Sequence, residues 1–161
     1  MKTSYLFPYR FKRISGIVFW ITLLLFIIGY FNSTIFFENE YFKTKVFALA
    51  ETGILEKNVF FGIIENSVLD EILFLILIVS GLIYAFSKEK TEDEMVSKIR
   101  LDSLVWATYF NYIFILFCYV FIYGFVFLSV MMIALFSHLL FFIIRFRWMM
   151  YKQNKLATDE E

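Results

Sequence analysis

Four long apolar runs constrain this chain more than any other feature, because each is close to the length of a membrane-spanning helix. At about 1.5 Å per residue, a helix of roughly 18 residues covers about 27 Å, nearly the thickness of a bilayer core. Soluble domains are typically about 45–50% apolar, whereas this chain is 61% hydrophobic and 22% aromatic. We therefore predict four transmembrane helices, at residues 14–31, 68–86, 105–122 and 128–144.

The charged residues lie between these runs, and their distribution predicts the orientation. Lys and Arg gather before the first run, between the second and third, and after the fourth, whereas residues 32–67 carry only Lys43, Lys45 and Lys57 and the turn around Gly124 carries none. Because cytoplasmic loops are enriched in Lys and Arg, we predict that both termini and residues 87–104 are cytoplasmic. The first run is preceded by a basic arm, as in a signal peptide, but no A-x-A-like site follows it, so we expect a retained helix.

The predicted fold class is all-α: a polytopic integral membrane protein that forms a single membrane domain over residues 1–161. The net charge is zero, which gives no indication of nucleic-acid binding. Thr91 and Glu94 have the spacing of a capping box, so a helix should start at Glu92 and extend from the cytoplasm into the third apolar run. Residues 145–161 should form a polar cytoplasmic tail.

Residues 32–67 alternate acids with aromatic pairs. They are too apolar for a solvated loop and too charged for two further spans. We predict an ordered outer segment that packs on the helices or lies in the membrane interface, where amphipathic rings are favoured. One short helix is predicted there, at Thr44 to Glu51.

Polar residues inside the third and fourth runs form a candidate intramembrane cluster. Counting outward from Gly124 in an antiparallel helix pair places Asn111 opposite His138 and Asp102 opposite Arg145 or Arg147. An ionisable group at membrane depth is a functional hypothesis by default, although a lone histidine also suits a neutral, hydrogen-bonded structural role. A metal site usually needs three or four ligands, so we predict no catalytic, cofactor or metal site. The predicted cluster comprises Thr108, Asn111, Ser137 and His138.

A second predicted site is a cytoplasmic partner surface, where charges of both signs alternate near the ends of the third and fourth helices. Such mixed charge suits docking to a protein better than attraction to anionic lipid, which favours mostly Lys and Arg. Its predicted residues are Glu92, Asp93, Glu94, Lys98, Arg100, Asp102, Arg145 and Arg147.

The stretch from Lys88 to Tyr151 contains KEKTEDE, IRLDSLVWA, Asn111-Tyr112 and IIRFRW. With these motifs it resembles small four-helix bacterial inner-membrane proteins that carry no established activity. The resemblance covers about two-fifths of the chain and implies a location in a bacterial inner membrane. It implies no catalytic residue.

Three functional hypotheses follow. The first is a non-enzymatic membrane component, a sensor, regulatory or accessory subunit, that contacts the lipid bilayer and a membrane-protein partner or further copies of itself. The alternative is a small oligomeric transporter or channel, which the lack of a carboxylate or Arg near the middle of any span disfavours. The third is an intramembrane enzyme that uses His138, which would require a carboxylate within its reach.

Overall fold

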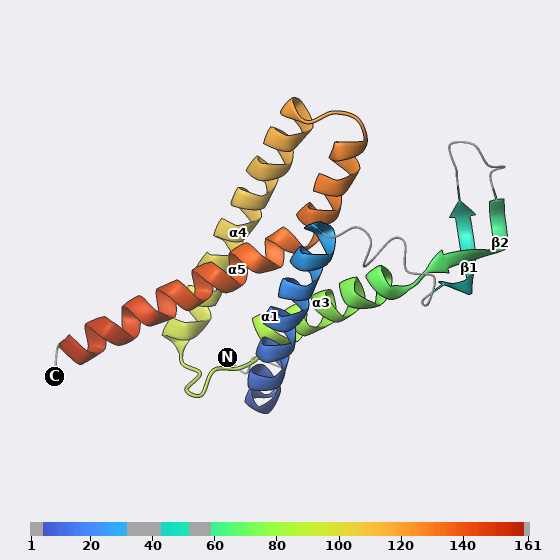
Figure 1. The fold of residues 1–161 in the computed structure, drawn as a ribbon. Coiled ribbons are helices and arrows are strands. Elements are labelled where there is room, and N and C mark those ends of the chain that lie inside the picture. Colours follow the sequence, from blue (N-terminus) through green and yellow to red (C-terminus); the bar gives the residue numbers. More distant parts are fainter. Residues whose placement is uncertain (1–4, 32–42, 52–58, 160–161) are drawn as a thin grey trace. The chain divides into compact units, whose positions relative to one another are not determined.

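The computed structural model describes residues 5–31, 43–51 and 59–159, and this part of the chain is mainly helical (Figure 1). Three helical segments are long and apolar enough to cross a membrane: Tyr9–Gly29, Glu94–Phe121 and Val126–Lys155. The elements in order are α1 (Tyr9–Phe31), β1 (Lys43–Glu51), β2 (Val59–Ser67), α3 (Leu69–Ala85), α4 (Glu94–Phe121) and α5 (Phe125–Asp159).

The chain divides into two compact units. One comprises Met1–Gly16 and Ser80–Glu161, and therefore holds the start of α1, the end of α3, and all of α4 and α5. The other is Ile17–Val79, with the rest of α1, the two strands and the start of α3. A single membrane domain over the whole chain stays a prediction.

Helices α4 and α5 form an antiparallel hairpin (Figure 1). At its start, Asp93 caps α4 by accepting a hydrogen bond from the backbone N–H of Val96 at 2.7 Å. At its turn, Gly124 has a φ of 72°, a conformation that costs a residue with a Cβ about 1–2 kcal/mol. Small buried side chains, Ala107 and Cys118 on α4 and Ala134 on α5, lie along the seam, as close helix packing in membranes prefers.

The boundaries of both helices differ from those predicted. Because Asp93 is the cap, α4 begins at Glu94 rather than Glu92, and it then runs unbroken into the apolar stretch as predicted. The residues predicted as a cytoplasmic tail continue α5 as far as Asp159, and their location stays a prediction. No Gly or Pro interrupts this continuation, and its Lys, Gln, Leu and Ala residues are strong helix formers.

The predicted outer segment contains an antiparallel β-hairpin, so the described chain is mainly rather than entirely α-helical, and the helix predicted at Thr44 to Glu51 is wrong. Strand β1 pairs with β2 from Lys43↔Ser67 to Glu51↔Val59. An isolated helix of eight residues is unstable in water, whereas β2 supplies a partner strand rich in the aromatic and β-branched residues that favour sheets. The rest of the predicted outer segment, residues 32–42 and 52–58, lies outside the described part of the chain.

Candidate functional site

The best-developed polar site joins the N-terminal arm to the loop that precedes α4. Phe7 forms a parallel β-bridge with Ser87. Its backbone N–H donates to the carbonyl oxygen of Phe86 at 3.0 Å, and its own carbonyl oxygen accepts from Lys88 at 2.9 Å. These bonds bring the first turn of α1 against the loop. We call the charged side chains gathered there the polar junction: Lys12, Glu89, Glu92, Arg100 and Arg147.

Lys12 and Glu89 form the centre of the polar junction. Lys12 Nζ is ion-paired with Glu89 Oε1, and the two side chains are only 6% and 13% exposed. Burying a charge is costly unless it is paired, so each side chain requires the other. Glu89 also suits its position, because the N-terminal end of a helix such as α1 favours negative charge.

Arg147 of α5 reaches the same carboxylate. Its Nη1 lies 3.9 Å from Glu89 Oε1, and its Nε donates a hydrogen bond to the Tyr84 hydroxyl at 3.0 Å. The guanidinium also lies over the Tyr84 ring, 4.9 Å from its centroid. Tyr84 in turn packs against Gly16, where a Cβ would lie 2.8 Å from the ring. The junction therefore joins parts of α1, α3 and α5 at one end of the unit.

The second ion pair ties the start of α4 to its preceding loop. Arg100 donates through Nη1 to Glu92 Oε1 at 2.5 Å and through Nη2 to Oε2 at 3.2 Å, a two-point geometry that strengthens Arg–carboxylate pairs. Glu92 Oε2 also accepts from the backbone N–H of Glu89 at 2.9 Å. Burial raises the pKa of Glu92, but these hydrogen bonds and the positive charges of Arg100 and Lys12 outweigh it and hold the pKa below its ordinary value.

An aromatic ring separates the two ion pairs. Phe146, 4% exposed, has Lys12 Nζ 6.0 Å and the Arg100 guanidinium 5.3 Å from its centroid. It stacks on Phe142 at 5.8 Å, and Phe142 stacks on Phe86 at 5.5 Å. Cations lying near an aromatic ring gain further stabilisation when they are desolvated. Three cations thus face two carboxylates in a packed arrangement that holds chain segments together.

The predicted cytoplasmic surface divides into buried and exposed residues. Glu92 and Arg100 pair with each other, and Asp93 caps α4. Arg145 lies over the Trp106 ring at 4.5 Å. Among the described residues Asp102 forms no ion pair, and Arg147 contacts Glu89 instead; that Asp102 faces the end of α5 stays a prediction. Besides the capping Asp93, the predicted residues that remain exposed without an ion pair in the described chain are Glu94, Lys98 and Asp102.

Sequence reasoning missed four residues of the site: Lys12, Tyr84, Glu89 and Phe146. Lys12 is one of several basic residues in the arm and Glu89 one of several acids before α4, so the local sequence distinguishes neither from its neighbours. Phe146 could have been noticed in the sequence, because it is a single aromatic residue between two arginines in Arg145-Phe146-Arg147. A helix turns about 100° per residue, so these three side chains must point in different directions.

In the predicted intramembrane cluster, Asn111 is joined to Ser137 rather than to His138. Ser137 Oγ donates to Asn111 Oδ1 at 2.5 Å across the α4–α5 seam, and both side chains are buried. Thr108 Oγ1 instead donates to the carbonyl oxygen of Leu104 in its own helix, at 2.9 Å. His138 is half-buried and makes no hydrogen bond with the described residues. Counting outward from Gly124, which we call mirror counting, therefore predicted the correct level of this contact along the two helices. It selected His138 instead of the neighbouring Ser137.

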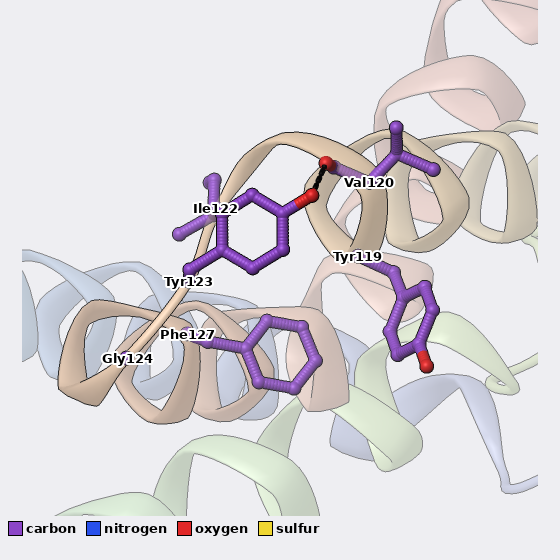
Figure 2. Close-up of a pocket in the computed structure, with 6 residues that line it drawn as sticks. All are labelled: Tyr119, Val120, Ile122, Tyr123, Gly124 and Phe127. Atoms are coloured by element: carbon purple, nitrogen blue, oxygen red, sulfur yellow. Dashed lines mark hydrogen bonds between the residues drawn. The ribbon is translucent and has the colours of Figure 1, made fainter.

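The turn of the α4–α5 hairpin holds a shallow hollow of about 370 Å³ (Figure 2). The Tyr123 hydroxyl donates to the carbonyl oxygen of Val120 at 2.5 Å and so closes over the turn. The wall of the hollow is largely apolar. Its tyrosines are of a type that is common where a helix leaves a membrane. The lining residues are Tyr119, Val120, Ile122, Tyr123, Gly124 and Phe127.

Among the described residues, no group of three or more His, Cys, Asp or Glu side chains is placed to hold a metal ion. No protein-family model matches this chain, and neither does any curated protein or solved structure.

Proposed function

We propose that this protein is a non-enzymatic, four-span membrane component whose polar junction fixes the arrangement of its helices and whose exposed charges receive a partner. The observation that carries the proposal is the contact between Lys12 and Glu89, which joins the start of α1 to the loop before α4. The contacting side chains of the polar junction are oppositely charged and paired with each other. They are not an acid and a base arranged around a cavity.

The same contact supports a fourth span. If α1 crosses the bilayer away from Lys12, the chain must cross back before it reaches Glu89, since these residues lie together. Only α3 is available for the return within the described residues. It has 17 residues, and its two acids, Asp70 and Glu71, lie in the first turn, where they would remain among the headgroups; a transmembrane helix takes about 17–25 residues.

The orientation rests on the distribution of basic residues. Lys and Arg are present in the N-terminal arm, in the loop before α4 and in the second half of α5, and absent from the turn at Gly124. By the positive-inside rule, the proposal puts the polar junction, both termini and the charged start of α4 in the cytoplasm. The resemblance of residues 88–151 supports the inner membrane of a bacterium as the location.

A partner-binding role is supported by what the junction leaves exposed. Glu92 and Arg100 neutralise each other, whereas Glu94, Lys98 and Asp102 point their charges to solvent. At the seam, the shared hydrogen bond of Ser137 and Asn111 is of the kind that joins membrane helices. His138 has no carboxylate partner among the described residues, which favours a binding role over intramembrane catalysis.

Site-specific photo-crosslinking in intact membranes tests the proposal. A crosslinker at Lys98 should give a discrete adduct with a membrane protein, and reversing the neighbouring charges with Glu94→Lys and Asp102→Lys should abolish it. A crosslinker at Tyr112, exposed on the apolar part of α4, is the matched control and should give no such adduct. The absence of an adduct at Lys98, or solute flux through liposomes containing only this protein, would refute the proposal.

A further inference from the structure

The β-hairpin exposes large apolar side chains that the rest of the described chain does not cover. Successive residues of a strand point to opposite faces of a sheet, and Phe47 lies directly opposite Ile63. Phe47, Leu49 and Ile63 therefore share one face, which we call the apolar face, and they are 65%, 66% and 72% exposed. On the opposite face, Val46 and Ala48 are half-buried, whereas Phe60, which pairs with Ala50, is 65% exposed.

This hairpin lacks the support that a two-stranded sheet requires. In the described chain the two strands make their extensive contacts only with each other. A two-stranded hairpin alone is marginally stable at best in water, and independent stability needs a further strand or a covering layer. The apolar face thus requires an occupant.

The hairpin is attached directly to α3, which points to the occupant. Only Val68 separates β2 from the first residue of α3, and Figure 1 shows β2 leading straight into that helix. Asn66 Nδ2 donates to Glu71 Oε1 at 2.7 Å, so the base of the hairpin is bonded to the first turn of α3. If α3 spans the membrane, this base lies at the bilayer surface.

The distribution of charge along the apolar face fits a lipid interface. Lys45 pairs with Glu65 at the base, and both are exposed. The apolar pair Phe47↔Ile63 follows two residues further along, a distance of about 7 Å. Charged heads can remain among lipid headgroups while neighbouring apolar side chains enter the acyl boundary. The outer edges of β1 and β2 have no partner strand in the described chain. They limit how deeply the hairpin can enter the bilayer, because open sheet edges do not occur in hydrocarbon.

We propose that the apolar face of this hairpin is a lipid-contacting surface that lies in the outer interface of the bilayer, next to the start of α3. This inference rests on the proposed function, since it requires that α3 cross the membrane. The surface would fix the rotation and depth of α3 through Phe47, Leu49 and Ile63, in the way that interfacial side chains anchor transmembrane helices.

Spin labels on single cysteines test this proposal in the full-length protein with Cys118→Ala. The protein is reconstituted in vesicles of phosphatidylcholine and phosphatidylglycerol. Labels at Leu49→Cys and Ile63→Cys should collide preferentially with oxygen, which concentrates in lipid, rather than with a water-soluble nickel chelate. The oxygen-to-nickel collision ratio should be several-fold higher than at Thr44→Cys, a control at the base of the opposite face.

Two results would overturn the proposal. Nickel-dominated collisions at positions 49 and 63 would show a face in water, and low collision rates with both reagents would show a face covered by protein, either a second copy or another chain. A label at Leu75→Cys, which is exposed on α3, reports separately on the proposed span. An oxygen-dominated signal at 75 with a nickel-dominated signal at 49 and 63 rejects the hairpin surface alone.

Discussion

Lys12 in the first turn of α1 and Glu89 in the loop before α4 form a buried ion pair, although they lie far apart in the chain. The pair forms because the bridge between Phe7 and Ser87 aligns the two segments. Around it, Arg147 and Phe146 of α5 complete a contact between two helices, α1 and α5, and the loop.

Lys12→Ala should destabilise the protein strongly. Removing one partner of a buried pair costs about 3–5 kcal/mol, because an uncompensated charge stays buried, and here Arg147 at 3.9 Å can recover part of that loss. Unfolding in mixed micelles would measure the change in free energy. The matched control is Arg13→Ala, since Arg13 is exposed, and it should change little. Equal effects of the two substitutions would contradict the assignment.

Acidification should weaken the loop before α4. The pKa of Glu92 is held below its ordinary value of about 4.5, so its ionised form is favoured in the folded protein. This stabilising contribution is complete above the ordinary value and is lost as the pH falls through the lowered pKa. Amide hydrogen exchange at Glu89, whose N–H donates to Glu92, followed from about pH 7 to about pH 3 and corrected for intrinsic rates, should show lost protection.

Glu92→Gln supplies the control for that experiment. Glutamine keeps the size of the side chain and cannot titrate, so protection should already be reduced at neutral pH and should vary less as the pH falls. A wild-type acid transition that Glu92→Gln leaves unaltered would assign the effect to another group.

Ser137→Ala should weaken the α4–α5 hairpin more than His138→Ala does. The first substitution leaves the buried amide of Asn111 without its cross-helix donor, and hydrogen bonds between membrane helices are worth about 0.6–1.7 kcal/mol. His138 has no hydrogen bond to the described residues, so its loss removes packing alone at that site. Unfolding free energies of the two variants measure the difference, and the reverse order would restore the Asn111–His138 pairing expected from mirror counting.

Gly16→Ala should disturb the junction from a distance. The added methyl would lie 2.8 Å from the Tyr84 ring, and overpacking of this kind costs about 1–3 kcal/mol. Because Tyr84 holds Arg147, the displaced ring should also weaken the contact of Arg147 with Glu89. In a double-mutant cycle of unfolding free energies, Tyr84→Ala should relieve most of the Gly16→Ala penalty. Additive penalties would show that the two side chains do not collide.

The helices of this chain could be predicted because each depends on local features. Continuous apolar residues, a capping acid near Asp93 and a glycine at 124 act within a few residues of the structure they determine. The hairpin could not be found in this way. The segment from Thr44 to Ala50 forms a strand because residues 60–66 pair with it, and no local pattern reveals a partner.

The candidate site also combines features that local sequence determines with features that depend on distant residues. The approximate depth of the seam contact followed from counting about Gly124, but choosing Ser137 over His138 requires the rotation of each helix about its axis. The polar junction depends on a bridge between Phe7 and Ser87, which lies beyond the reach of helix periodicity or charge counting. Glu89 therefore could not be distinguished by sequence from its solvated neighbours.

The central claim, that α1 and α3 both cross the membrane so that Lys12 meets Glu89, is tested most directly by cysteine accessibility. Single cysteines at Arg10, Lys45 and Lys90, in the Cys118→Ala protein, would be treated with a membrane-impermeant maleimide in sealed right-side-out and inverted vesicles. Our account predicts that positions 10 and 90 are labelled only in inverted vesicles and position 45 only in right-side-out vesicles. Labelling of positions 45 and 90 from the same side, or of 10 and 90 from opposite sides, would contradict it.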